Sequence, residues 1–145
     1  IIMNLALFSC LLMLKRNNEY YEEIEDLSGL SKNHPLLSLS LLIILFSLAG
    51  IPPLAGSFAK FYIFKAVIEQ SMYFLAIVGL LSTVIAAFYY LRVIKIIYFD
   101  MEKEKYDQDH NIWLKFSLTF STILILLYFI FPSQLIDVVS RINII

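Results

Sequence analysis

The chain has 145 residues, of which 60% are hydrophobic and 16% are charged, and its formal net charge is -1. This composition is typical of membrane proteins and provides no basic surface for a nucleic-acid partner. Cys10 is the only cysteine, which excludes an internal disulfide and any cysteine-built metal or iron–sulfur site within these residues. His34 and His110 lie far apart, beside predicted spans and without a second ligand at helical spacing, so we predict no metal site.

Four apolar segments predict an all-α membrane protein with about four transmembrane helices, one of them discontinuous. The first segment is shorter than a full span and lacks a signal-peptide pattern, and the chain opens Ile1-Ile2-Met3, so we expect a fragment or one product of a split gene. Residues 1–145 would form a single membrane domain, with a partial or first span at 1–14, the broken helix at 36–70, further spans at 72–99 and 112–131, and a short interfacial carboxyl-terminal helix at 133–145.

Two polar stretches separate the spans. Residues 15–33 predict a loop with a short surface helix, after which Asn33 would cap the next span and Pro35 would occupy its first helical position. Residues 100–111 predict a second loop. Most bases lie near these two loops, whereas Arg141 lies at the opposite side, so the loops should face the cytoplasm or the mitochondrial matrix.

The segment 36–70 is too long to cross a bilayer as one straight helix, because about 20 helical residues span the hydrocarbon core. Its middle contains four residues that break or loosen a helix: Gly50, Pro52, Pro53 and Gly56. We therefore predict a break near mid-membrane. Unwound backbone at that depth is tolerated where protein or a water-filled cavity covers it, as in ion and proton paths.

Lys60 follows this break and is the predicted proton-relay residue. With a second half-helix starting near Ser57, burial and the helix dipole would disfavour the charged ammonium, whereas carbonyls freed around residues 48–51 would favour it. A lysine for which both protonation states are accessible can accept a proton and release it. The alternative is a lysine that extends to the interface, and for Lys65, closer to the segment end, that alternative is favoured.

A secondary polar path could include Lys65, Ser82, Thr83 and Tyr89, although hydroxyls in membrane helices more often serve packing. Apart from Glu69, next to the end of the segment 36–70, the predicted spans contain no carboxylate, so an acid or histidine partner for Lys60 is expected from another chain or from missing sequence. No residues form a nucleophile–base pair, a phosphate loop or a haem ligand set, so we assign no catalytic residue and no redox chemistry to this chain.

Several runs, taken in order, resemble the antiporter-like membrane subunits of respiratory complex I. They are Asp26-Leu27-Ser28-Gly29-Leu30, His34-Pro35, the run Ser47-Leu48-Ala49-Gly50-Ile51-Pro52-Pro53-Leu54-Ala55-Gly56-Ser57-Phe58-Ala59-Lys60-Phe61-Tyr62, and Tyr89-Tyr90-Leu91-Arg92. The resemblance is greatest to the N type, NADH dehydrogenase subunit 2 in mitochondria, and Ser57 departs from the family's usual aromatic residue.

This resemblance implies the carboxyl-terminal portion of a proton-translocating subunit of respiratory NADH:ubiquinone oxidoreductase, with Lys60 in the outer part of the proton path. The chain would be a non-redox subunit with no cofactor of its own, since FMN and iron–sulfur clusters would lie in other subunits. Its implied partners are lipids, other membrane subunits and a chain or segment supplying the missing amino-terminal bundle. The implied location is multi-pass in the mitochondrial inner membrane or, alternatively, the bacterial plasma membrane.

Two other functions stay open at this point. A subunit of a cation/proton antiporter or of a membrane-bound hydrogenase would share the same module. A structural membrane anchor would need only a lysine that extends to the interface and a proline break that shapes packing.

Overall fold

The computed structural model describes the chain except residues 17–18, 21–22, 53, 102–106, 109–110 and 131–145. The described residues form six α-helices, so the predicted helical architecture is confirmed in outline. The long segment is interrupted as predicted: Gly50 ends its first half, and Gly56 lies in the first turn of its second half. The interfacial helix predicted at 133–145 lies outside the described residues. The helices are α1 (Ile2–Met13), α2 (Leu30–Asn33), α3 (Pro35–Ala49), α4 (Ala55–Glu69), α5 (Tyr73–Phe99) and α6 (Ile112–Ile130), with a 3-10 turn at Ile24–Leu27.

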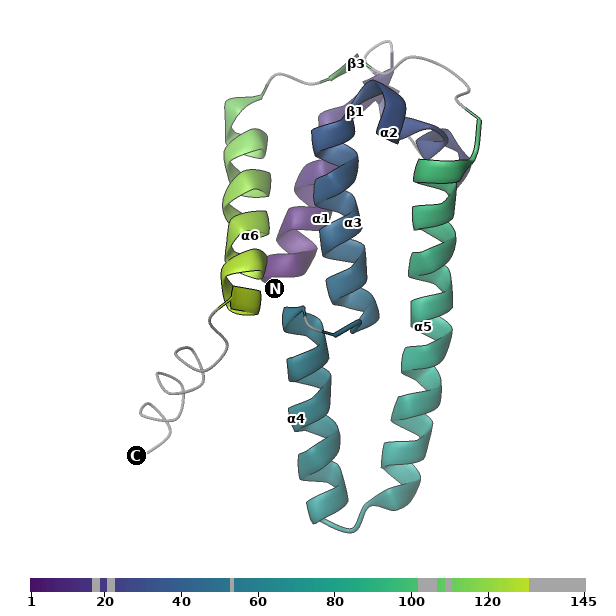
Figure 1. The fold of residues 1–145 in the computed structure, drawn as a ribbon, viewed down its shortest axis with the longest axis vertical. Helices are drawn as coiled ribbons and strands as arrows, with labels where there is room; N and C mark the ends of the chain where they lie inside the picture. The colour runs from purple at the N-terminus through teal and green to yellow at the C-terminus, as the bar shows by residue number, and fades with distance from the viewer. Residues whose placement is uncertain (17–18, 21–22, 53, 102–106, 109–110, 131–145) are drawn as a thin grey trace.

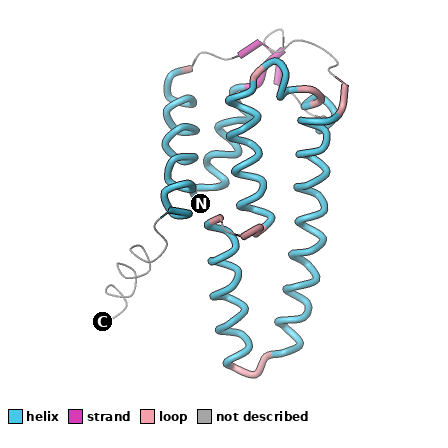
Figure 2. Tube along the Cα trace, in the orientation of Figure 1, coloured by secondary structure: helices cyan, strands magenta, loops and turns pink. Residues whose placement is uncertain are grey.

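The helices pack in two unequal halves (Figures 1 and 2). In the half nearer the polar loops, α1, α3 and α6 lie side by side, and the hydroxyl of Ser9 on α1 donates to that of Ser117 on α6 at 2.9 Å. In the other half, α4 continues beyond the end of α3, and α5 runs back alongside both. The interrupted helix α3–α4 and the continuous helix α5 therefore run in opposite directions along the molecule.

The polar loops form a small sheet that the sequence analysis did not predict. Its strands are β1 (Leu14–Arg16), β2 (Glu19–Tyr20) and β3 (Asp107–Gln108), in the antiparallel order β2-β1-β3. Strands of two or three residues are too short to show the alternation of apolar and polar residues that predicts a strand. Both loops lie at the same end of the molecule, which agrees with the prediction that they share one side of the membrane (Figure 1).

The start of α3 corrects one prediction. Pro35 does take the first helical position, where its missing N–H costs nothing, but the N-cap residue is His34 and not Asn33. Asn33 instead ends the short helix α2, and its amide nitrogen is buried without a hydrogen-bond partner among the described residues.

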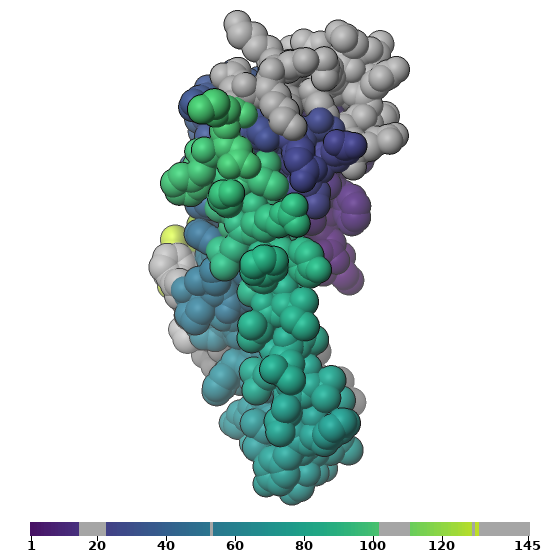
Figure 3. All heavy atoms as spheres, turned by 90° about the vertical axis from the view of Figure 1, so that its right-hand side faces the viewer, coloured from purple at the N-terminus to yellow at the C-terminus, as the bar shows by residue number. Residues whose placement is uncertain are grey.

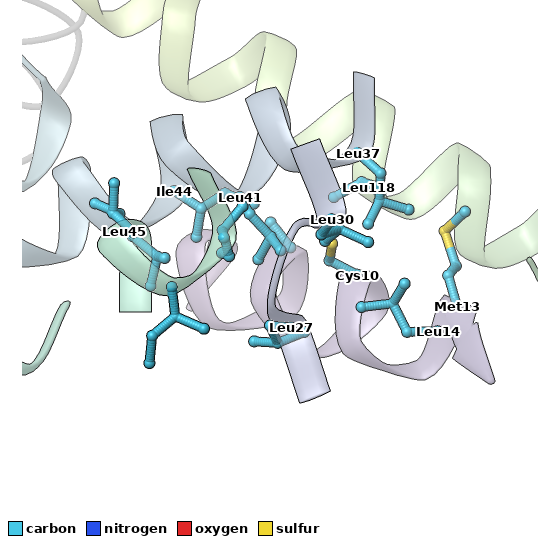
Figure 4. Packing of buried hydrophobic residues seen from close by; sticks show 14 of the residues in the cluster. Cys10, Met13, Leu14, Leu27, Leu30, Leu37, Leu41, Ile44, Leu45 and Leu118 are labelled. Atoms are coloured by element: carbon cyan, nitrogen blue, oxygen red, sulfur yellow. The ribbon is translucent and has the colours of Figure 1, made fainter. Parts of the chain in front are cut away.

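One cluster of buried apolar side chains joins the helices (Figure 4). It draws Cys10 from α1, Leu41 and Ile44 from α3, Ile97 from α5 and Leu118 from α6. The outer surface is also apolar: α5 exposes large side chains along its length, with Phe74 81% exposed and Val84 67% exposed (Figure 3). A helix that is apolar on its outer face is suited to lipid or to another membrane subunit.

Helix α5 is long and apolar enough to cross a membrane, with 27 residues and a mean hydropathy of 2.2 over its most apolar window. At 1.5 Å per residue it is about 40 Å long, which exceeds the hydrocarbon thickness of about 30 Å. Among the described residues it is the single helix that meets this length and composition. The shorter apolar stretches are α1, α3 and the part of α6 from Ile112 to Tyr128.

Candidate functional site

The long segment breaks where Gly50 ends α3. Gly50 has φ 83° and ψ 30°, the left-handed conformation that glycine adopts without the steric cost of a side chain. Its N–H donates to the Ser47 carbonyl at 3.1 Å, and the N–H of Ile51 donates to the Phe46 carbonyl at 3.1 Å. This pair of bonds is a Schellman motif, which uses two of the carbonyls left unpaired at the end of a helix.

The next two carbonyls of α3, those of Leu48 and Ala49, accept hydrogen bonds from Lys60. Both distances from the Nζ atom are 2.9 Å. These carbonyls carry the negative end of the helix dipole, so they attract a cation. The ammonium of Lys60 therefore caps α3 from the following half-helix.

Gly50 also makes room for the lysine side chain. A Cβ atom at this position would lie 2.8 Å from Cδ of Lys60 and 3.0 Å from its Nζ. The site therefore needs glycine for two independent reasons, the positive φ and the close approach of Lys60. Pro52 lies exposed in the break, and Pro53, the other predicted proline, lies outside the described residues.

The second half-helix begins slightly earlier than predicted, at Ala55 instead of near Ser57. Ser57 lies in its first turn and donates its hydroxyl to the Leu54 carbonyl at 2.7 Å. Gly56 is buried against the last turn of α3: its N–H donates to the Ser47 hydroxyl at 3.2 Å, and a Cβ there would overlap the Ser47 carbonyl oxygen. The predicted break residues Gly50 and Gly56 thus lie on the two sides of the same junction.

Lys60 is partly buried, and within the described residues both of its hydrogen-bond partners are backbone carbonyls. Other side chains of α4 meet the neighbouring helices: Phe58 packs edge-to-face on Tyr128 of α6 with ring centroids 5.7 Å apart, and Phe64 lies against Gly79 of α5. The described residues thus place the ammonium against carbonyls and supply no carboxylate partner for it.

Lys65, one turn and a half further along α4, has a different environment. Its ammonium lies 3.8 Å from the carboxylate of Glu69 on the same helix, and both side chains are more than half exposed. An exposed pair at this spacing contributes roughly 0.3–0.5 kcal/mol.

The predicted secondary path contains hydroxyls that bond to their own helix. Ser82 donates to the Gly79 carbonyl and Thr83 to the Leu80 carbonyl, each at 2.7 Å. Tyr89 is 57% exposed and contacts the ring of Phe88. None of these described contacts joins Ser82, Thr83 or Tyr89 to Lys60.

Ser47 is a site residue that was not predicted from the sequence. Its side chain is fully buried, and its hydroxyl links three helices by accepting from Gly56 and donating to the sulfur of Met3 at 3.3 Å. A signal was available, since a polar residue lies in an apolar run three positions before the glycine that ends the helix.

The described residues contain no group of three or more His, Cys, Asp or Glu side chains placed to hold a metal ion. The groups gathered at the break are instead carbonyl oxygens, the hydroxyls of Ser47 and Ser57, and the ammonium of Lys60. Such an arrangement can hold a cation or exchange a proton at Nζ.

Residues 1–86 match a family model described as "NADH:quinone oxidoreductase/Mrp antiporter, TM". The chain is 85% identical over 145 residues to NADH-quinone oxidoreductase subunit N of Pelagibacter ubique, covering 100% of this chain and 31% of that protein. It is 44% identical over 136 residues to the same subunit of Parvibaculum lavamentivorans, covering 94% of this chain and 28% of that protein. The chain thus spans about three-tenths of the length of these curated relatives.

The fold resembles a chain in the structure titled "Respiratory complex I from Thermus thermophilus with bound Aureothin", with a TM-score of 0.71 over 90% of this chain and 31% of that one, at 22% identity. The matched residues 1–86 include α1, α3, the break and Lys60. The resemblance expected from the sequence is therefore confirmed, and the chain belongs to the family of transmembrane subunits of NADH:quinone oxidoreductases and Mrp antiporters.

Proposed function

We propose that this chain is the carboxyl-terminal part of an N-type, proton-translocating membrane subunit of a respiratory NADH:quinone oxidoreductase, and that Lys60 relays protons through it. The observation that supports this most strongly is the Lys60 ammonium at the helix break, where it bonds two carbonyls at 2.9 Å. An ionisable residue at interrupted backbone within a membrane helix is costly and is characteristic of ion and proton paths.

In the proposed arrangement the chain crosses the membrane about four times, through α1, the interrupted pair α3–α4, α5 and α6. The two polar loops lie on the cytoplasmic side, because most of the lysines and arginines are near them. Residues 133–145 remain a predicted interfacial helix at the other side.

The proposed relay uses the two protonation states of Lys60. As an ammonium, Nζ donates to the carbonyls of Leu48 and Ala49 and is held by the negative end of the α3 dipole. When Nζ loses its proton toward the outer face, that attraction is lost and the side chain becomes free to turn toward a donor. A conformational or electrostatic change arriving from the quinone side would drive this alternation.

The remaining parts of the reaction belong to other chains or segments. The other seven-tenths or so of the relatives' length would supply the amino-terminal bundle and the acid or histidine that exchanges protons with Lys60. FMN, iron–sulfur clusters and the ubiquinone site would lie in other subunits. The bacterial relatives favour the bacterial plasma membrane over the mitochondrial inner membrane as the location.

A second candidate is a subunit of a cation/proton antiporter, because the family description also includes Mrp antiporters. In that case the carbonyls at the end of α3 would alternate between the Lys60 ammonium and a metal cation. Transport that depends on sodium and does not depend on NADH oxidation would favour this candidate.

The test is the substitution Lys60→Met in the assembled complex, with Lys65→Met as the matched control on the same helix. In sealed membrane vesicles, Lys60→Met should reduce the protons moved per NADH oxidised while the complex still assembles. Lys65→Met should leave that ratio unchanged, because its partner Glu69 is an exposed side chain of the same helix. A normal ratio in the Lys60→Met complex would remove Lys60 from the path.

A further inference from the structure

Ser47 occupies the junction of three helices. It lies in the last turn of α3, its side chain is 0% exposed, and its hydroxyl donates to Met3 of α1 at 3.3 Å. The same oxygen accepts the N–H of Gly56 at 3.2 Å, in the first turn of α4. That amide is one of the donors that an α-helix leaves unpaired at its start, and it is buried here.

This hydrogen bond fixes α4 at the point from which Lys60 must reach. Gly56 is the buried residue of α4, and it lies directly against Ser47 of α3. Gly56 and Lys60 are four residues apart and lie on the same face, one turn from each other. The carbonyls that Lys60 binds, Leu48 and Ala49, directly follow Ser47 in the chain.

We propose that Ser47 is a positioning residue for the proton relay: by accepting the Gly56 amide, it holds α4 in the orientation that lets Lys60 bind both carbonyls. This inference rests on the proposed function of Lys60. Without the hydroxyl, the buried amide of Gly56 loses its partner, and the first turn of α4 must move to satisfy it. The Lys60 ammonium can bind both carbonyls only while α4 keeps its position, so such a movement breaks at least one of the two hydrogen bonds.

The experiment compares Ser47→Ala with Ser38→Ala in the full complex. Ser38 is a matched control because it lies on the same helix, is 1% exposed, and donates only within that helix, to the Pro35 carbonyl at 2.9 Å. Leaving the buried Gly56 amide unpaired should lower the fraction of complexes in which Lys60 binds both carbonyls by about fivefold or more. We therefore expect Ser47→Ala to lower the protons moved per NADH. Ser38→Ala should leave this ratio unchanged.

A conservative variant separates positioning from packing. Ser47→Thr keeps the acceptor oxygen but adds a methyl group in a fully buried place, so it should lower the amount of assembled complex and preserve the proton ratio of each complex. Ser47→Ala should instead leave the amount of assembled complex unchanged and lower the proton ratio of each complex. If both variants lowered assembly and left the ratio of each assembled complex normal, Ser47 would be a packing residue and the proposal would be overturned.

The Lys60→Met background provides the final control. If Ser47 acts through Lys60, Ser47→Ala should cause no further loss of proton pumping in that background. An additional loss there would overturn the positioning role. A normal ratio for Lys60→Met alone would instead overturn the proposed function of the lysine, so the two failures are distinguishable.

Discussion

Substitution of Gly50 by alanine tests the geometry of the break most sharply. The φ of 83° is unfavourable for an L-residue with a side chain, at a cost of roughly 1–2 kcal/mol. That cost shifts the ratio of intact to disrupted break by a factor of about 5–30. The added Cβ would also lie 2.8 Å from Cδ of Lys60, so the lysine must leave its present position.

Gly50→Ala should therefore lower the protons moved per NADH in sealed vesicles, measured for each assembled complex. Gly50→Asn separates the two causes, because asparagine tolerates the left-handed conformation but still places a Cβ against Lys60. We expect it to assemble better than Gly50→Ala and to pump equally poorly. Gly79→Ala is the control: Gly79 does not have a positive φ, and a Cβ there would meet only the ring of Phe64.

Two results would refute this reasoning. Normal pumping by assembled Gly50→Ala complexes would show that the close approach of Lys60 is not required. Full recovery of pumping in Gly50→Asn would show that backbone strain alone, and not crowding of Lys60, explains the loss in the alanine variant.

Two further predictions concern contacts away from the break. Arg92→Gln removes an ion pair of 3.7 Å with Glu25, in which both side chains are about half exposed. The free energy of unfolding should fall by no more than about 1 kcal/mol, and proton pumping should be normal. A loss of pumping would contradict the assignment of this pair to the loop surface. Ser9→Ala removes the hydrogen bond between α1 and α6 and should destabilise the assembled complex by roughly 0.6 kcal/mol, with no further loss when Ser117→Ala is added; additive losses would mean that the two hydroxyls stabilise the protein independently.

The interrupted helix could be predicted from the sequence because a few residues determine it. The excess length of 36–70 requires a break, and Gly50 and Gly56 mark its two sides. The carbonyls expected to stabilise Lys60, around residues 48–51, include the two that it binds. Such features lie within one continuous segment of the chain, and the residues at the break and Lys60 lie within about four helical turns of each other.

Contacts between distant segments could not be predicted. The pairing of β1 with β3 joins residues about 90 positions apart, through strands too short to carry a pattern. The role of Ser47 depends on Met3 and Gly56 meeting at one atom. The position of Ser47 before Gly50 marks a polar residue near the break, but it does not reveal these two contacts. The cap assigned to Asn33 was wrong because the preceding residues form the short helix α2, which ends at that residue.

The central claim is that Lys60 carries a proton and does not merely cap α3. Lys60→Arg separates these roles most directly, because arginine keeps a cation and hydrogen-bond donors beside the Leu48 and Ala49 carbonyls but does not release a proton. The measurement is the number of protons moved per NADH by the assembled Lys60→Arg complex. Our account predicts a loss similar to that of Lys60→Met, whereas a normal ratio would contradict it.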